Sequence, residues 1–357
     1  MIVFLHIDPL LNDPSMIIGR LRDFKILWRE LIKAGVQPYW VISKDVLSSY
    51  AKRENIEGNV IFVDVGITDV QEHESYQLTV YTSAVSQRLR HAMINAYKSI
   101  KIVPDAIITN TPSYFLRCTW PTCLIFHFEL GVFHRRPFER TFSLDPLGYC
   151  HNSVSAKIPS LISSAVGTKL LNLVNFNRIQ EIYADLWSKL PTIGGTKGVF
   201  VPLSSGITWV SNIESGGLSR LGQVDAAKRA FNGETLYVAE KPQAKLSDEE
   251  RKIIMDDENC VILENSSFEG IGTFGARKFS RTYSCSSSLI LQALFWGREA
   301  RTEVTSSVHS WCMMDLEQVQ RAFSLLFHFS QFRPNKDNIV RAIEAGSVFV
   351  DLLSRAR

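Results

Sequence analysis

A carboxylate and a pair of arginines lie close together after a predicted strand. Glu129 is followed by Gly131 and then by Arg135 and Arg136. A carboxylate can exchange protons with a substrate, and guanidinium groups bind carboxylates and phosphates through paired hydrogen bonds. This segment is therefore a candidate catalytic and anion-binding site. The alternative is a solvated charged loop, which the charges alone favour slightly.

Consecutive serines separate a short predicted strand from an apolar helix. Ser286, Ser287 and Ser288 precede a helix that is expected to stop at Gly297. Hydroxyl groups and the free N–H groups of a helix start bind phosphate or carboxylate groups. One serine is enough to cap a helix, so three favour a ligand site over simple N-capping, which is the alternative.

Two further patterns carry weaker signals. Lys241 follows a predicted strand and precedes Pro242 and Gln243, so its ammonium can pair with a phosphate or carboxylate of a ligand. An ordinary surface lysine is the alternative.

Residues 270–275 match the glycine spacing GxGxxG of dinucleotide-binding proteins. That motif normally opens the turn between a strand and a helix. Because this setting is not evident here, we expect a cleft loop at Gly275 and no nicotinamide cofactor.

Alternating strands and helices must position these residues. Apolar runs predict strands at 2–7, 39–43, 60–65, 106–109, 123–128, 199–203, 235–239 and 261–263, and helical spacing predicts helices at 17–31, 85–97 and 338–353. This alternation indicates parallel sheets with helices on both faces, which bind ligands beyond the carboxyl ends of their strands. We predict an α/β protein with two Rossmann-like domains facing each other across a cleft.

The glycine-rich stretch 191–198 is the best candidate for a linker between the domains. The predicted domains are residues 1–193 and residues 194–357, and the terminal helix can pack back across the boundary. A chain of 357 residues exceeds the size at which a single core usually stops growing, roughly 250 to 300 residues.

The composition excludes several classes of protein. The formal net charge is only +3, which does not indicate a protein that coats nucleic acid. The six cysteines have no zinc-ligand spacing, and no Asp-x-Asp motif is placed to hold a metal-bound diphosphate. No apolar run approaches the roughly 20 residues needed to cross a bilayer. We expect a soluble cytoplasmic protein without metal or cofactor, whose contact with the inner membrane would be peripheral.

Taken in this order, the segments resemble the bacterial capsule-polysaccharide glycosyltransferase family that includes retaining β-Kdo transferases. The most specific parts are Glu-x-Gly leading into Arg136-Pro137, and Ser-Ser-x-x-x-Gln-Ala-Leu-x-x-Gly ending at Gly297. The apolar strand at 199–203 is also similar to the family pattern. The resemblance covers about residues 126–311. It implies the GT-B fold and a CMP-activated sugar donor. It also implies that the N-terminal domain, residues 1–193, lies on the acceptor side and that the C-terminal domain, residues 194–357, binds the nucleotide-sugar. Any contact with polysaccharide-assembly proteins would be peripheral.

The resemblance also implies roles for individual residues. Glu129 matches an active-site glutamate, and the serines at 286–288 match positions that hold anionic groups of the donor. Lys241 and Pro242 match a Lys-Pro-His-like donor motif in which the histidine is replaced by Gln243. The family's catalytic aspartate, expected shortly after Leu203, is absent, and Glu214 is the nearby carboxylate that can replace it.

These observations lead to one principal hypothesis and two alternatives. The principal hypothesis is an enzyme that transfers an acidic ulosonic sugar, Kdo or a relative, from its CMP conjugate to a saccharide or glycolipid acceptor. The missing aspartate motivates the first alternative, a degenerate GT-B protein that binds a sugar, nucleotide or partner subunit without catalysis. The second alternative is a dehydrogenase, which rests only on the glycine pattern at 270–275.

Overall fold

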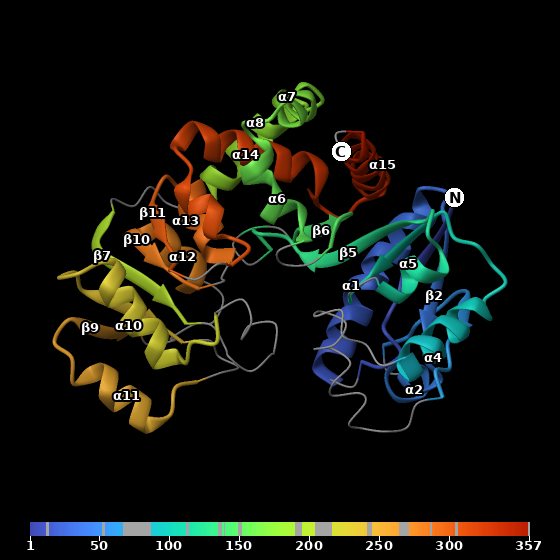
Figure 1. Ribbon diagram of the computed structural model, residues 1–357, viewed down its shortest axis with the longest axis horizontal. Coiled ribbons are helices and arrows are strands. Elements are labelled where there is room, and N and C mark those ends of the chain that lie inside the picture. Colours follow the sequence, from blue (N-terminus) through green and yellow to red (C-terminus); the bar gives the residue numbers. More distant parts are fainter. Residues whose placement is uncertain are drawn as a thin grey trace. The chain divides into compact units, whose positions relative to one another are not determined.

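The computed structural model describes residues 1–11, 14–51, 54–66, 87–111, 114–134, 138, 140–148, 152–189, 195–203, 216–240, 245–263, 271–285, 288–303 and 306–355. Its contacts divide the chain into two compact units (Figure 1). Unit 1 comprises Met1–Leu130, Phe142–Tyr149 and Phe329–Arg357, and unit 2 comprises Gly131–Thr141 and Cys150–His328.

The two units differ from the predicted ranges 1–193 and 194–357. Residues 150–189 group with the second sheet because their helices pack within unit 2, whereas the C-terminal helix groups with the first sheet. The predicted boundary between residues 193 and 194 lies outside the described residues.

Unit 1 contains seven strands in one sheet. Its strands are β1 (Ile2–His6), β2 (Gln37–Ile42), β3 (Val60–Phe62), β4 (Ala106–Thr109), β5 (Leu124–Leu130), β6 (Phe142–Asp145) and β12 (Gln331–Phe332). Its helices are α1 (Pro14–Lys33), α2 (Lys44–Val46), η1 (Leu47–Ala51), α4 (Gln87–Lys98), α5 (Tyr114–Thr119) and α15 (Lys336–Ser354).

The sheet of unit 1 has the order β12-β6-β5-β4-β1-β2-β3. The five strands β1 to β5 are parallel and have the doubly wound order 3-2-1-4-5 of a Rossmann-like sheet. Strands β6 and β12 continue the sheet in antiparallel pairing, which the sequence did not predict. β1 and β4 run in the same direction, but the chain adds strands on one side of β1 and then, from β4, on the other side. The ligand-binding crevice of this sheet is therefore expected at the carboxyl ends of these two strands.

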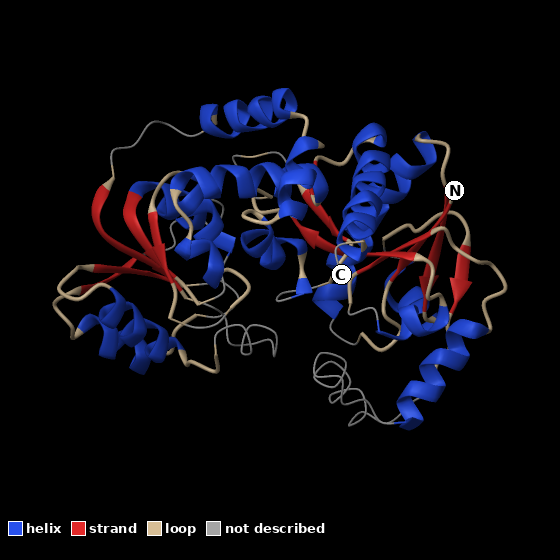
Figure 2. Ribbon diagram, turned by 45° about the horizontal axis from the view of Figure 1, so that its top comes forward, coloured by secondary structure: helices blue, strands red, loops and turns tan. Residues whose placement is uncertain are grey.

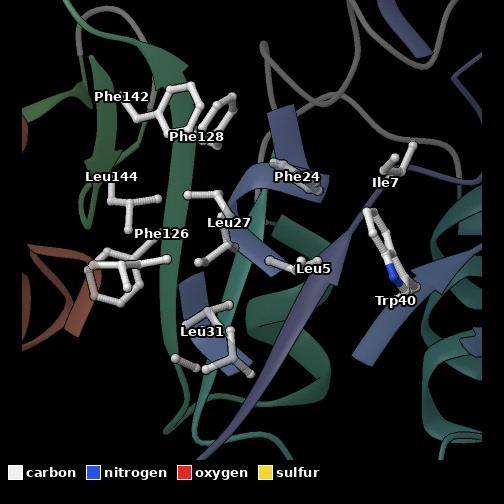
Figure 3. Packing of buried hydrophobic residues seen from close by; sticks show 14 of the residues in the cluster. Leu5, Ile7, Phe24, Leu27, Leu31, Trp40, Phe126, Phe128, Phe142 and Leu144 are labelled. Carbon is white, nitrogen blue, oxygen red and sulfur yellow. The ribbon is translucent and has the colours of Figure 1, made fainter. Parts of the chain in front are cut away.

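Apolar side chains of α1 explain how this sheet is covered. Phe24, Leu27 and Leu31 recur at helical spacing and are fully buried against Leu5 of β1 and Phe126 of β5 (Figure 3). Helix α15 joins the same cluster, and α4 and α5 cover the opposite face of the sheet. Helix α1 ends at Lys33, and the φ of 73° at Gly35 allows the chain to turn.

Unit 2 has a second parallel sheet, again flanked by helices (Figure 2). Its strands are β7 (Thr196–Pro202), β8 (Leu236–Ala239), β9 (Cys260–Leu263), β10 (Phe279–Tyr283) and β11 (Glu299–Arg301). Its helices are α6 (Val154–Leu161), α7 (Ala165–Asn172), α8 (Phe176–Ser188), α10 (Arg220–Ala230), α11 (Asp248–Met255), α12 (Ile271–Lys278), α13 (Ser288–Phe295), η3 (His309–Met313) and α14 (Leu316–Phe329).

The order β11-β10-β7-β8-β9 is again 3-2-1-4-5 when the strands are counted from β7. The crevice of this sheet is therefore expected at the carboxyl ends of β7 and β10. The predicted α/β class with two Rossmann-like halves is confirmed. Among the described residues, no helix combines the length and the apolar character needed to cross a membrane.

The glycine pattern at 270–275 does not form the expected loop at its end. Gly275 lies inside helix α12, where an added Cβ would come 2.5 Å from Cε2 of Phe200 on β7. The glycine is required because helix and strand approach too closely for a side chain. The pattern also follows β9, the third strand of the winding order, whereas the dinucleotide fingerprint follows the first strand. The prediction of a cleft loop at Gly275 was therefore wrong.

Candidate functional site

Glu129 lies at the end of β5 in unit 1, as the last residue but one of the strand. The strand is longer than predicted because Glu129 pairs with Ser143 of the antiparallel strand β6. The Glu129 side chain is 50% exposed, so its carboxylate is accessible to a substrate.

Arg20 of α1 holds this carboxylate in place. Its Nη2 donates hydrogen bonds to both carboxylate oxygens of Glu129, each at 3.2 Å. The guanidinium carbon lies 5.4 Å from the centre of the Phe128 ring, which adds a cation–π contact. Sequence analysis missed Arg20, because the two residues are 109 positions apart and helical spacing marks only the apolar face of α1.

Asp145, another carboxylate of the same segment, has a structural role. It is buried, and its Oδ1 accepts hydrogen bonds from the backbone N–H groups of Leu147 at 2.9 Å and Gly148 at 3.2 Å. This is the geometry of a turn stabilised by an aspartate side chain. Glu129 is therefore the more available proton acceptor of the two.

Buried polar groups lie at the crevice of unit 1. His6, at the end of β1, shares hydrogen bonds with Thr109 Oγ1 at 2.8 Å and with Tyr97 Oη at 2.7 Å. Burial lowers the pKa of His6 to about 3, so the ring is neutral at physiological pH. Asp8, two residues after β1, is a buried carboxylate, and burial together with this nearby charge raises the pKa of Tyr97. Asn110 follows Thr109 directly, and both polar atoms of its buried amide have no hydrogen-bond partner among the described residues.

The crevice of unit 2 has a different chemistry. Ser284 follows β10 and donates a hydrogen bond from Oγ to the carbonyl oxygen of Pro202, at the end of β7, at 3.3 Å. Ser288 is the first residue of α13 and is exposed. The start of an apolar helix thus lies at the carboxyl end of β10, where a parallel sheet of this winding binds ligands. Cys285 between them is buried, which raises the pKa of its thiol to about 11.

Gln292 explains part of the motif that contains the serines. It is buried on α13, and its Nε2 donates a hydrogen bond to the carbonyl oxygen of Val132 at 2.7 Å. It therefore anchors the segment that begins with Gly131. A Cβ at Gly131 would come 2.3 Å from Thr141 Oγ1, so only glycine fits there. Both motif positions are thus explained by packing within unit 2.

Several predicted site residues fall outside the described residues, and their assignments stay predictions: Arg135, Arg136, Glu214, Lys241, Gln243, Ser286 and Ser287. Within the described ranges, no three His, Cys, Asp or Glu residues come together as a metal site would require.

A scan against protein-family models finds no match, and the comparison with curated protein sequences finds none either. Similar solved structures include "KpsC, beta Kdo 2,7 transferase" of Thermosulfurimonas dismutans, at 13% identity and a TM-score of 0.44, covering 80% of this chain and 96% of that one. A glycosyltransferase of Rickettsia africae is 9% identical, with a TM-score of 0.39 and 98% coverage of both chains. A UDP-GlcNAc 2-epimerase of Methanocaldococcus jannaschii is 10% identical, with a TM-score of 0.37, covering 99% of this chain and 100% of that one.

Proposed function

We propose that this chain is a GT-B glycosyltransferase that moves an acidic ulosonic sugar, Kdo or a relative, from its CMP conjugate to a saccharide acceptor in bacterial surface-polysaccharide synthesis. The observation that carries the proposal is the serine-rich start of α13 at the crevice of the second sheet. Hydroxyl and N–H groups in that position suit the phosphate of a nucleotide or the carboxylate of the sugar. The motif resemblance supports the choice of donor.

Glu129 is the proposed proton acceptor. In the transfer, the acceptor oxygen forms a bond to the anomeric carbon, and the bond from that carbon to the donor phosphate breaks. CMP leaves with the bonding electrons, and the proton of the acceptor hydroxyl passes to the carboxylate. The exposed carboxylate and its two hydrogen bonds from Arg20 support this role. Glu214 is the candidate for the missing family aspartate, and Lys241, Gln243, Arg135 and Arg136 are candidates for holding anionic groups.

Ligand-dependent stabilisation tests the donor class. We expect CMP to raise the melting temperature of the protein more than UDP, GDP or NAD, because only a ligand of the folded state stabilises it. Alanine at Ser286, Ser287 or Ser288 should weaken CMP binding in calorimetry, whereas the control Ser160→Ala, on the exposed surface of α6, should not. Unchanged CMP affinity in all three variants contradicts the assignment of the serine cluster.

The degenerate, non-catalytic alternative is favoured by one feature, the absence of an aspartate after Leu203. A turnover assay with CMP-Kdo and a saccharide acceptor separates the two functions. CMP binding without release of CMP from the donor would support the degenerate protein, and stoichiometric bound NAD would overturn both.

A further inference from the structure

A cavity of about 300 Å³ lies on the outer side of α1 in unit 1, away from the crevice. It is lined by the second half of α1, by β2 and by the loop that precedes β3: Lys25, Trp28, Arg29, Ile32, Lys33, Trp40, Asn55 and Glu57. In a βαβ unit the helix runs antiparallel to its strands, so this half of α1 lies toward their amino ends. The volume is at the lower end of the range of small-ligand pockets.

The wall of the cavity is rigidly built. The indole rings of Trp28 and Trp40 stack with centroids 5.5 Å apart and an angle of 13° between their planes. The Trp40 backbone N–H donates to the carbonyl oxygen of Asn59 at 2.9 Å, and its indole N–H donates to that of Glu57 at 3.2 Å. These bonds fix the loop from residue 54 to residue 59 against both rings.

The same loop contains two unusual backbone conformations. Asn55 has a φ of 49°, which places a residue other than glycine in the left-handed region. Gly58 has a φ of 102°, and a Cβ there would come 2.0 Å from Cζ2 of Trp28. Glycine adopts a positive φ freely and asparagine does so more readily than most residues, so these two positions let the loop pass close to Trp28.

The cavity has a positive charge. Three of its lining residues are the cations Lys25, Arg29 and Lys33, and Glu57 is its one carboxylate. Lys25 donates to the carbonyl oxygen of Glu54 at 2.9 Å, and Lys33 pairs with Glu30 at 2.7 Å. Arg29 is exposed and has no ion-pair partner within the described part of the chain. A ligand with a negative charge and an apolar face therefore complements this cavity.

We infer that this cavity is a second saccharide-binding site, which takes one acidic sugar unit with its carboxylate at Arg29 and its ring against Trp28 and Ile32. The choice of a sugar rests on the proposed function. Bound here, a growing acidic saccharide stays on the protein between transfers, which raises its effective concentration at the reaction site.

The test uses two sugars that differ at one group. D-glucuronate and D-glucose are titrated into ¹⁵N-labelled full-length protein, and the indole N–H signals of Trp28 and Trp40 are followed by NMR. We expect glucuronate to shift these signals saturably and glucose to bind about tenfold more weakly, which corresponds to about 1.4 kcal/mol. Arg29→Gln should weaken glucuronate binding several-fold. Lys98→Gln, a matched loss of one exposed helical cation, should leave the affinity unchanged.

Three outcomes overturn the inference: equal affinity for the two sugars, unchanged glucuronate affinity in Arg29→Gln, or CMP binding at this cavity in preference to glucuronate. Because the signals report binding alone, the titration is repeated in the Glu129→Gln variant. If this variant has lost transferase activity but still binds glucuronate, the second site exists independently of the proposed catalytic role of Glu129. If the wild-type protein turns over CMP-Kdo and still binds no glucuronate here, only the second site is lost.

Discussion

The two Rossmann-like sheets have the same winding order but present different chemistry at their crevices. In unit 1, the neutral buried residues His6, Thr109 and Asn110 occupy this position. In unit 2, Ser284 bridges β10 to β7 and a helix starts at the exposed Ser288. The two sheets therefore share the expected position of a ligand crevice and differ in the residues that follow their strands. Unit 1 also has the buried carboxylate of Asp8 there, whereas the helix start in unit 2 suits an anion. This difference agrees with our proposal that unit 2 binds the anionic donor.

The largest expected effect concerns Glu129 of unit 1, the proposed proton acceptor. Glu129→Gln keeps the shape of the side chain and removes its basicity, so transfer should slow by about 10² to 10⁴. The melting temperature should change little, because an ion pair with a half-exposed partner contributes about 1 kcal/mol or less. CMP release and thermal unfolding are measured together, with Asp351→Asn, which breaks a surface pair with Arg355, as control. Near-normal turnover would eliminate Glu129 as the proton acceptor.

The second prediction is that acid destabilises unit 1 more than unit 2. Burial lowers the pKa of His6 to about 3 and that of His127 to about 4, against about 6.5 in the unfolded chain. Below pH 6.5 these histidines bind protons in the unfolded chain but stay neutral in the folded unit, so the free energy of unfolding falls as the pH falls. At pH 5 each histidine should lower the free energy of unfolding by about 2 kcal/mol.

Hydrogen exchange at pH 7 and pH 5, corrected for its intrinsic pH dependence, checks this difference. Protection should fall more in β1, β4 and β5 than in β7, β8 and β10. His328 of unit 2 also has a lowered pKa, through burial and the nearby Arg178, but it is only partly buried. The double variant His6→Gln, His127→Gln should lose most of the pH dependence. An equal loss of protection in both sheets would contradict the prediction.

Alanine substitutions at two helical glycines compare the packing of the two units. Gly275→Ala in α12 places a methyl group 2.5 Å from Cε2 of Phe200, so the free energy of unfolding should fall by about 1 to 3 kcal/mol. Gly19→Ala in α1 meets no atom within 4 Å and should stabilise the protein by about 0.5 to 1 kcal/mol. Denaturant unfolding of both variants measures the difference. The same sign in both would show that helix propensity outweighs packing at Gly275.

The smallest expected effect tests the crevice of unit 1. Both amide atoms of Asn110 are buried without a hydrogen-bond partner in the described part of the chain, which carries a desolvation cost of about 1 to 3 kcal/mol. Asn110→Leu, of similar shape, should therefore raise the melting temperature by a few degrees. Thr109→Val at the adjacent position removes the hydroxyl that is hydrogen-bonded to His6, so it should lower the melting temperature. If Asn110→Leu is as destabilising as Thr109→Val, the amide contributes to the fold.

Local sequence patterns predicted most strands, including the edge strands β3 and β9, but missed β6, β11 and β12. Buried parallel strands such as β1 and β4 are continuous apolar runs, which periodicity detects. The strands β6 and β12 were missed: β12 has only two residues and pairs across a long sequence separation, through Gln331 and Ser143. The bond from Arg20 to Glu129 was missed for a similar reason, because no local pattern links residues on different elements.

The amino-acid sequence by itself determined the α/β class, the approximate positions of most central strands, and the helix stop at Gly297, because these depend on neighbouring residues. It also singled out Glu129 and Ser288 by type and position. Only the tertiary structure decided that Arg20 holds the Glu129 carboxylate, that Gln292 anchors the segment after Gly131, and that Gly275 packs on Phe200. Each of these contacts joins segments distant in the chain, so its geometry exists only once the sheets and helices have packed.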